Sequence, residues 1–405
     1  MRYKLLSVLC LMIIGSGAIA QQAVPNYLQS YKQLYRKDPH AAALKWFDDA
    51  RFGLFIHWGP STFYKKGEWN MFYSKIPIAE YKEQAMKFTG EKFNADSIVA
   101  LAKTAQMKYI TYVVQHHDGF AMYDSKANPF NSMNANAHRD YLKELVVACK
   151  RSGLGLFIYY SLGINWTHPF YLSKKYYNEA RPAYQTEQPE IRFKDKSDFV
   201  YYWNTVKAQI FELSTQYGDI AGFWFDPIGG AYTNPELFQV QDIYDMIKRL
   251  QPQALVSYKT GFNGNEDFIS CEHEVKSLTT LMRQVQGEKT AQMAEKAWQS
   301  NRTKKAEMCT TMQNKGWGYD ENSTHKSAAD VWKLLENTAK NNANLLLNIG
   351  PYPDGAIVPV DKKALTEVGL KIRKEGFPTL NTKTYMQFRD EGDKKITERD
   401  LETIK

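Results

Sequence analysis

The sequence predicts an α/β protein, and more specifically a (β/α)8 TIM-like barrel. Eight short apolar runs recur along the chain, and longer amphipathic or polar stretches separate them. Continuous apolar strands that alternate with helices indicate a parallel sheet covered on both faces. About eight repeats over roughly 330 residues fit a barrel with insertions better than an open doubly wound sheet. No glycine-rich phosphate loop follows the first run, which disfavours the nucleotide-binding alternative.

The elements follow from these runs in chain order. Each apolar run is short enough for a strand, and the predicted strands are 52–58, 109–115, 154–161, 220–226, 254–259, 267–272, 306–312 and 344–350. Several intervening segments place apolar residues at helical spacing and finish in basic residues or Gly, as helix ends often do. The predicted helices are 94–107, 139–153, 199–218, 237–252 and 328–342.

The two ends of the chain differ from this repeat. Residues 1–20 begin with Arg2 and Lys4, continue with an apolar run from Leu5 to Ile14 and end in small residues. This pattern predicts a cleaved secretory signal peptide, because the run is too short to span a bilayer. We therefore expect an exported protein, periplasmic or extracellular, with one barrel domain over 21–381. Residues 382–405 form a polar, charged C-terminal tail.

Composition excludes several classes of protein. The net charge of +8 over 405 residues is modest and accompanies no nucleic-acid motif, so it indicates solubility and no nucleic-acid partner. No later stretch is apolar enough for a membrane helix. Without the leader, Cys149, Cys271 and Cys309 remain, an odd number that indicates buried thiols, although one disulfide stays possible. The aromatic content of 14% is high, and sugars stack on aromatic rings.

Polar residues stand where the apolar runs end. They are His57, the group His116, His117 and Asp118, the pair Tyr159 and Tyr160, then Asp226 and Glu272. In a parallel barrel the carboxyl ends of the strands converge on one mouth, where catalysis takes place. One such residue is more often structural, but several at the same position of successive repeats indicate a shared site.

Two chemistries use such a set. One is metal-assisted hydrolysis with the ligands His57, His116, His117 and Asp226. The other is glycoside hydrolysis by two carboxyl groups, with histidines and aromatic rings holding the sugar and no metal. The first strand offers one His where barrel metallohydrolases carry His-x-His. The surrounding aromatic residues favour the sugar chemistry; they are Trp58, Trp69, Phe120, Trp166, Trp224 and Trp317.

The motifs WFDDARFGLFIHWGP, GEWN, HHDGF, YYS, WFD and NLLLNIGP, in this order, resemble the α-L-fucosidases of glycoside hydrolase family 29. The resemblance extends from Trp46 to about Phe377. It implies a (β/α)8-like barrel and retaining hydrolysis of terminal α-L-fucosides on oligosaccharides or glycoconjugates, with no cofactor and no metal. The C-terminal β-sandwich of many relatives is not evident, so we expect a more open leaving-group side.

The resemblance also assigns roles by motif. It implies that Asp226, at the end of WFD, is the nucleophile. It implies that the sugar is bound by His57, Glu68, Trp69, His116, His117, Tyr159, Trp224 and Trp317. Within this set, Trp224 and Trp317 would pack against the sugar and its C5 methyl group. We also expect the histidines to keep Asp226 ionised while the acid/base begins protonated.

The acid/base assignment rests on a looser match. The run DFISCE resembles the strand that carries this residue in one branch of the family, which implies Glu272; Glu266 and Glu274 are competitors. Lys259 stands where some branches have Arg, and Lys does not replace Arg at a bidentate site. Two alternatives therefore remain open: a related exo-glycosidase with galactoside preference, and a catalytically weak sugar-binding barrel.

Overall fold

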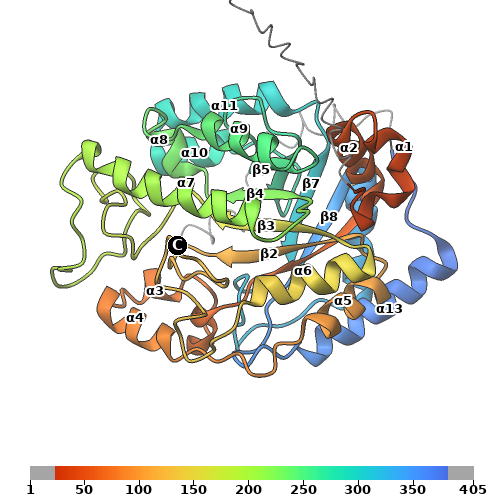
Figure 1. Ribbon diagram of the computed structural model, residues 1–405, viewed down its shortest axis with the longest axis horizontal. Helices are drawn as coiled ribbons and strands as arrows, with labels where there is room; N and C mark the ends of the chain where they lie inside the picture. Colours follow the sequence, from red (N-terminus) through yellow and green to blue (C-terminus); the bar gives the residue numbers. More distant parts are fainter. Residues whose placement is uncertain (1–22, 382–405) are drawn as a thin grey trace, which may run out of the picture.

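The eight strands of the computed structural model form one parallel sheet in the order β5-β4-β3-β2-β1-β8-β7-β6 (Figure 1). The structure describes residues 23–381, so the predicted signal peptide and C-terminal tail lie outside the described residues. The strands are β1 (Phe52–Ile56), β2 (Tyr109–Gln115), β3 (Gly155–Ser161), β4 (Gly222–Asp226), β5 (Leu255–Tyr258), β6 (Ile269–Glu272), β7 (Ala306–Thr311) and β8 (Ala343–Ile349). Each overlaps a predicted strand in sequence, and the predicted fold class is confirmed.

The sheet closes almost completely on itself. β5 and β6 stand at the two ends of the strand order. Between them, Asp267 N donates to Val256 O at 2.7 Å and Ser270 N donates to Lys259 O at 2.9 Å. These bonds join the two edges and leave no long open edge strand. The result is a nearly closed (β/α)8 barrel, whose carboxyl strand ends share one mouth.

The sequence pattern located five of the outer helices. They are α5 (Ala95–Thr104), α6 (Tyr141–Ser152), α7 (Phe199–Thr215), α9 (Val240–Leu250) and α12 (Ala328–Lys340). Their ends follow local chemistry: Asp140 accepts from Lys143 N at 2.9 Å at the start of α6, and Gly153 ends that helix with a φ of +68°. Ser327 and Asp330 form a capping box at the start of α12.

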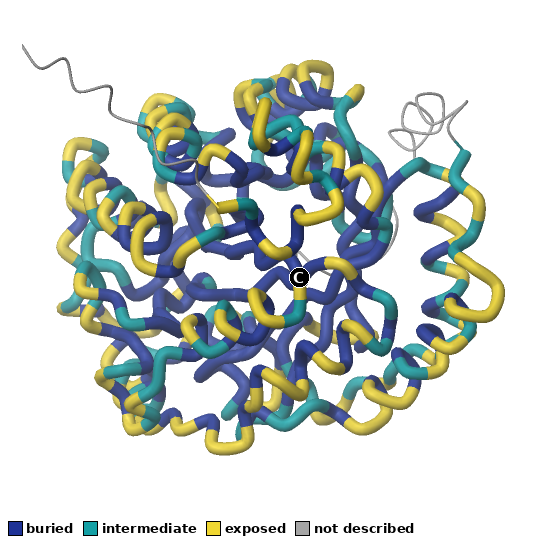
Figure 2. Tube along the Cα trace, turned by 45° about the vertical axis from the view of Figure 1, so that its right-hand side comes forward, coloured by how far each residue is buried: buried dark blue, intermediate teal, exposed yellow. Residues whose placement is uncertain are grey.

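The pattern did not single out the other described helices. The α-helices that it missed are α1 (Lys32–Tyr35), α2 (Pro39–Ala50), α3 (Asn70–Tyr73), α4 (Ile78–Met86), α8 (Gly229–Thr233), α10 (Thr279–Gln286), α11 (Glu288–Asn301) and α13 (Pro359–Glu375). Three 3-10 turns complete the described elements: η1 (Asn26–Tyr31), η2 (Pro60–Tyr64) and η3 (Lys196–Asp198). The strands lie inside the shell of helices, whose outward faces are exposed (Figure 2).

Helix α2 closes the amino end of the barrel. Trp46 stacks on Phe157 with a ring-centroid distance of 6.1 Å, and Phe47 lies 4.3 Å from Phe268. These rings continue into the barrel interior, where Phe55 and Trp224 belong to the same buried cluster. Because this end is filled by side chains, a ligand can enter only at the opposite, carboxyl end.

Two further sequence expectations concern described residues. Cys149, Cys271 and Cys309 are buried free thiols, which confirms their interpretation as small apolar side chains. Among residues 23–381 no helix combines the length and apolar character needed to cross a bilayer.

Candidate active site

A cavity of about 1380 Å³, counting the space at its open mouth, lies at the carboxyl ends of the strands. All ten residues predicted for the site line it: Asp226, Glu272, His57, Glu68, Trp69, His116, His117, Tyr159, Trp224 and Trp317. They come from six different strands or the loops that follow them, namely those of β1, β2, β3, β4, β6 and β7. The structure thus brings together what the sequence separates by up to 260 positions.

Asp226 is the last residue of β4 and is only 7% exposed. Tyr159 OH donates to Asp226 Oδ2 at 2.7 Å. Tyr159 lies on the neighbouring strand β3, in register with Trp224, and the two rings stack at 5.4 Å. The parallel register therefore fixes both the tyrosine that holds the carboxylate and the aromatic surface below it.

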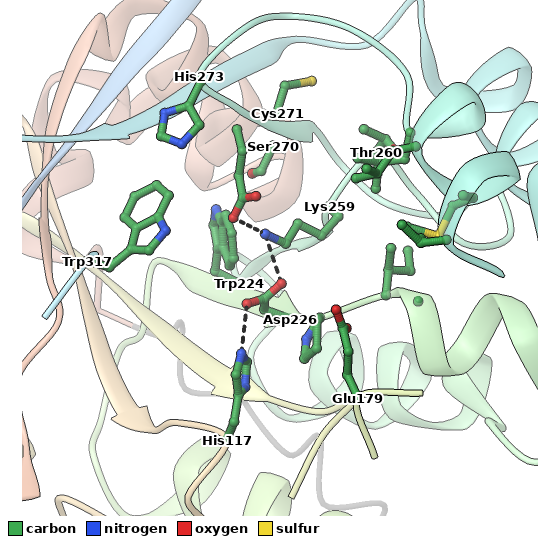
Figure 3. A pocket seen from close by; sticks show the side chains of 18 of the residues that line it. His117, Glu179, Trp224, Asp226, Lys259, Thr260, Ser270, Cys271, His273 and Trp317 are labelled. Atoms are coloured by element: carbon green, nitrogen blue, oxygen red, sulfur yellow. Dashed lines mark hydrogen bonds and ion pairs between the residues drawn. The ribbon is translucent and has the colours of Figure 1, made fainter. Parts of the chain in front are cut away.

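Lys259 bridges the two carboxyl groups assigned to catalysis (Figure 3). Its Nζ lies 2.9 Å from Asp226 Oδ1 and 2.5 Å from Glu272 Oε1. Lys259 directly follows β5 in a left-handed conformation with a φ of +49°, and its ammonium stands 5.1 Å from the centre of the Trp224 ring. The sequence drew attention to Lys259 only as a replacement for Arg. The structure makes it the charge that joins Asp226 to Glu272.

The protonation tendencies of this triad differ from the sequence expectation. Burial raises the pKa of Asp226 and Glu272 adds to the rise, so the Lys259 ammonium offsets it only in part. Burial also opposes ionisation of Glu272, but Lys259 and His273 outweigh it and lower its pKa below the ordinary value. Burial lowers the pKa of Lys259, and the two carboxylates more than reverse this. Both shifts run opposite to the expected order, an ionised Asp226 beside a protonated Glu272.

The histidines are not the charges that were expected to hold Asp226 ionised. Burial lowers the pKa of His57 to about 3 and that of His117 well below its ordinary value. His116 is shifted in the same direction, by burial first and then by its neighbour His117. All three rings are therefore neutral hydrogen-bonding groups, because protonation in this buried site beside Lys259 is unfavourable.

Asn348 on β8 fixes the tautomer of His57. Its Oδ1 accepts from His57 N at 3.1 Å and lies 2.8 Å from His57 Nδ1. Its Nδ2 donates to Trp317 O at 2.7 Å, which sets the amide orientation. Nδ1 of His57 must then carry the proton, leaving Nε2 as an acceptor for a sugar hydroxyl. The motif NLLLNIGP contained Asn348, and its polar side chain within an apolar strand was the available signal.

His117 is oriented in the same manner. Ser161 Oγ donates to Ile164 O at 2.6 Å, so it accepts from His117 Nδ1 at 2.7 Å. His117 Nε2 is then a free acceptor, 3.9 Å from Asp226 Oδ2. Two acceptors at this spacing leave a place for a hydroxyl hydrogen from a ligand. His116 is adjacent, with its ring centroid 3.8 Å from that of His117.

Glu68 and Trp317 form the opposite wall of the cavity. Glu68 Oε2 accepts from the backbone N–H groups of Trp317 and Gly318, both at 2.7 Å. These bonds hold the GWG loop, so that the Trp317 ring lies 5.2 Å from His57 and 5.6 Å from His273. Trp69 lies edge-on to His117 at 5.1 Å. Aromatic rings and acceptors therefore alternate around the cavity.

The structure separates the competitors for the acid/base role. Glu266 accepts from Tyr244 OH at 2.7 Å and from the backbone N–H groups of Phe262 and Gly264, and it does not line the cavity. Its role is to hold the β5–β6 loop. Glu274 lines the cavity, but its side chain is 46% exposed and pairs with Lys276 at 3.5 Å. Glu272 is the competitor that contacts the Lys259 bridge.

Two acids escaped the sequence analysis, the buried Glu307 and the partly buried Glu179. Glu307 on β7 accepts from Trp224 Nε1 at 2.9 Å, Ser270 Oγ at 3.1 Å and Tyr109 OH at 2.5 Å, and burial raises its pKa to about 7. Glu179 lines the cavity from the loop between β3 and α7 and accepts from Tyr177 OH. No motif marks Glu179, because it stands in a long polar segment without periodicity.

A metal site of ordinary geometry is not formed by the described part of the chain. Among residues 23–381 no group of three or more His, Cys, Asp and Glu side chains could hold a metal ion. The donor set of the metal alternative, His57, His116, His117 and Asp226, does not converge in this way. The Lys259 ammonium is the cation that faces Asp226 here.

Known proteins of similar sequence indicate the same chemistry. Residues 18–376 match the protein family described as Alpha-L-fucosidase. Among curated proteins, the tissue alpha-L-fucosidase of Mus musculus is 28% identical over 351 residues, covering 82% of this chain and 70% of that protein. The Homo sapiens tissue enzyme is 26% identical over 386 residues, covering 89% and 74%.

Solved structures agree. Alpha-L-fucosidase AlfC from Lactobacillus casei, in complex with α-L-fucose, superposes with a TM-score of 0.66 at 29% identity, covering 82% of this chain and 98% of that one. Alpha-L-fucosidase from Vibrio sp. strain EJY3 gives a TM-score of 0.67 at 27% identity, covering 84% and 57%.

Proposed function

Because this chain belongs to the α-L-fucosidase family, we propose that it is a retaining exo-α-L-fucosidase in which Asp226 and Glu272 perform a double displacement. The coarser statement, a glycoside hydrolase acting on α-L-fucosides, follows from the family match and the curated relatives. The observation that supports the finer one is the Lys259 bridge between the buried Asp226 carboxyl group and the partly buried Glu272 carboxyl group at the mouth of the barrel.

The spacing of these groups supports retention. Lys259 Nζ contacts both, so the nearest oxygens of Asp226 and Glu272 can lie no more than about 5.4 Å apart, the sum of the two contacts. Retaining glycosidases separate their carboxyl groups by about 5–5.5 Å, and inverting enzymes by about 6.5–9.5 Å to admit a water. A water between nucleophile and base does not fit the shorter spacing.

In the first step Asp226 attacks the anomeric carbon and Glu272 gives its proton to the leaving oxygen. Burial raises the pKa of Asp226, and Lys259 lowers that of Glu272 against the effect of burial, so both shifts oppose the reactive form, in which Asp226 is ionised and Glu272 is protonated. Sugar hydroxyls that donate toward Asp226 would favour that form, because such bonds stabilise the ionised carboxylate.

In the second step Lys259 helps to reverse the role of Glu272. Once Asp226 is esterified it carries no charge, so the ammonium pairs with Glu272 alone. The pKa of Glu272 then falls further, and the carboxylate can take a proton from the water that attacks the anomeric carbon. Water attacks from the side that the leaving group vacated, and the sugar leaves with its configuration retained.

The test is an assay of purified protein on a panel of aryl glycosides and fucosylated oligosaccharides, with the first-formed sugar identified by NMR. Turnover of an aryl α-L-fucoside with α-L-fucose as the first product agrees with the proposal. β-L-fucose as the first product would contradict retention. Faster turnover of a galactoside would favour the galactoside-preferring alternative, and binding of fucose without turnover of any substrate would favour the sugar-binding barrel.

Export is a separate part of the proposal. It rests on residues 1–20, which read as a cleaved signal peptide and lie outside the described residues. N-terminal sequencing of the protein recovered from a cell fraction tests it. A mature chain that starts near Gln21, found outside the cytoplasm, agrees with export. A full-length chain starting at Met1 in the cytoplasm would contradict it.

A further inference from the structure

The cavity has two chemically different halves. One half carries the neutral histidines, Glu68 and Trp317 described above. The other half, called the apolar half below, carries a group of apolar side chains. They are Ile228, Leu278, Leu281, Met282 and Val285, and the neighbouring Lys276, Ser277, Thr280 and Gln286 also line the cavity. These apolar side chains extend the lining beyond the ten residues predicted for the site. The apolar half therefore offers space for a second group.

Helix α10 supplies most of the apolar half. Leu278, Leu281, Met282 and Val285 recur at the spacing of one helix face, and all four line the cavity. Met282 is buried, whereas Leu278, Leu281 and Val285 remain partly exposed. Partly exposed apolar side chains that face a cavity gain free energy when a ligand covers them. Glu272, which lies six residues before Leu278, lines the same cavity as this face.

Glu179 is the acid of this half. Figure 3 places Glu179 and Trp317 on opposite sides of Asp226. Tyr177 OH donates to the Glu179 carboxyl group, and Trp166 Nε1 donates to its backbone oxygen at 3.0 Å, so the side chain is held in place. Its loop also meets α10 directly, because Asn178 Nδ2 donates to Val285 O at 3.2 Å. The loop and the helix thus form one wall.

Glu179 offers a hydrogen-bonding group to a ligand in this half. Burial raises the pKa of Glu179, the bond from Tyr177 offsets the rise in part, and the nearby charges of Asp226 and Glu272 add to it. The carboxyl group can accept from a hydroxyl or amide N–H of a ligand when ionised, and can donate to a hydroxyl when protonated. Beside an apolar wall it would orient a ligand that has one hydrocarbon face and one polar edge.

We propose that Glu179 and the apolar face of α10 form the subsite for the leaving group. The subsite takes a leaving group that presents a hydrocarbon face to α10 and a hydroxyl or amide group to Glu179. This inference rests on the proposed function, because it assigns the polar half to fucose. Glu179 here binds and orients the departing group, and Glu272 remains the residue that protonates it.

Three substrates isolate the subsite: α-L-fucosyl fluoride, methyl α-L-fucoside and cyclohexylmethyl α-L-fucoside. The fluoride has no leaving group large enough to reach α10, and the two alkyl fucosides have similar leaving-group chemistry but different apolar area. We expect wild-type kcat/KM for the cyclohexylmethyl fucoside to exceed that for the methyl fucoside by at least tenfold, roughly what one or two buried methylene groups give.

The helix face is tested with Leu281→Ser and Val285→Ser, each compared with Gln284→Ser on the exposed side of α10. The alkyl preference is the ratio of kcat/KM for the cyclohexylmethyl fucoside to that for the methyl fucoside. We expect the two cavity-facing variants to lower this ratio toward one without affecting fluoride hydrolysis. Gln284→Ser should leave the ratio unchanged. An unchanged preference in both cavity-facing variants would overturn the assignment of α10. If these variants do not fold, the wild-type ratio decides, and a ratio near one would overturn it.

Glu179 is tested on a fucosyl-N-acetylglucosamine disaccharide with Glu179→Ala, Glu179→Gln and the control Glu187→Ala on the same loop. Loss of the Glu179 hydrogen bond should raise KM for the disaccharide about tenfold and leave the fluoride unaffected. Glutamine, which can also form hydrogen bonds at this position, should restore most of the loss. A fall in fluoride hydrolysis would place Glu179 against fucose instead. An α-fucosyl azide from Glu179→Ala with added azide would make it the proton donor.

The two proposals fail in distinguishable ways. If wild-type protein does not hydrolyse α-L-fucosyl fluoride, the proposed function fails. If it hydrolyses the fluoride but shows no preference between the alkyl fucosides and no effect of Glu179→Ala on the disaccharide, only the leaving-group subsite fails.

Discussion

Lys259 Nζ lies 2.5 Å from Glu272 Oε1, an ion pair in which the lysine side chain is 9% exposed and the glutamate 32%. The same ammonium contacts Asp226 at 2.9 Å. One cation therefore sets the proton affinities of both carboxyl groups. Removal of the Lys259 charge should therefore shift the pH profile of activity, an effect that loss of folding alone would not produce.

Replacing Lys259 with Met should shift both limbs of the pH profile of kcat/KM upward. Lys259 lowers the proton affinity of Asp226 and of Glu272, so its removal raises the pKa of each, by about one unit or more for an opposite charge at this distance. Lys259→Arg retains the charge and serves as the control. A Lys259→Met profile that coincides with wild type would show that the bridge does not control these groups.

Replacing Glu272 with Gln should remove the alkaline limb of the profile on a fucoside with a good leaving group. Activity then requires only ionised Asp226, so the rate rises with pH to a plateau. The midpoint of that rise should lie below the wild-type acid limb, because the variant lacks the Glu272 charge that adds to the pKa of Asp226 and leaves Lys259 paired with Asp226 alone. Survival of the alkaline limb would mean that another residue donates the proton.

Trp317→Ala should weaken recognition of the methyl group of fucose more than recognition of its hydroxyls. The ring borders the sugar-binding half beside His57 and is held there by Glu68. We expect kcat/KM for an aryl α-L-fucoside to fall more, by about 1–3 kcal/mol of discrimination, than that for the α-L-galactoside, which carries a hydroxyl on C6. Equal losses on both substrates would leave only general stacking as the role of Trp317.

Glu307→Gln should destabilise the fold. All three groups that contact the Glu307 carboxyl, from Tyr109, Trp224 and Ser270, donate to it, and the amide replaces one acceptor oxygen with a donor. We expect a loss of about 1–3 kcal/mol in the free energy of unfolding, measured with denaturant at pH 7.5. The control is Glu336→Gln, because exposed Glu336 also accepts from an indole, that of Trp332. Equal stability of both variants would contradict the buried network.

The sequence was sufficient for the strands and for the residues at their ends. Apolar runs predicted all eight strands because parallel strands in a barrel are buried on both faces, which leaves a plain signal. The motifs also identified Asp226, the histidines and the three tryptophans, which line one cavity. By contrast, α10 is only eight residues long and α11 is rich in small and polar residues, so neither stood out as a long amphipathic segment.

The protonation order and the role of Glu179 could not be predicted in this way. The charge that faces Asp226 depends on distances across the barrel, and the sequence places Lys259 thirty-three positions away from Asp226. The sequence suggested charged histidines because a motif contains no information on their burial or on the adjacent Lys259 ammonium. Glu179 reaches the cavity through the path of a long loop, which no local pattern determines.

The most direct test of the double displacement is the stereochemistry of azide rescue. In Asp226→Gly, azide enters the space of the lost nucleophile, attacks once and should give β-fucosyl azide. In Glu272→Gly, Asp226 still forms the covalent intermediate with a good leaving group, and azide should give α-fucosyl azide. Product configuration identifies each role without relying on the size of a rate loss. Formation of both azides, each from its own variant, is the result that we predict. Absence of β-fucosyl azide from Asp226→Gly and from variants of the neighbouring acids, in protein that still folds, would contradict double displacement itself.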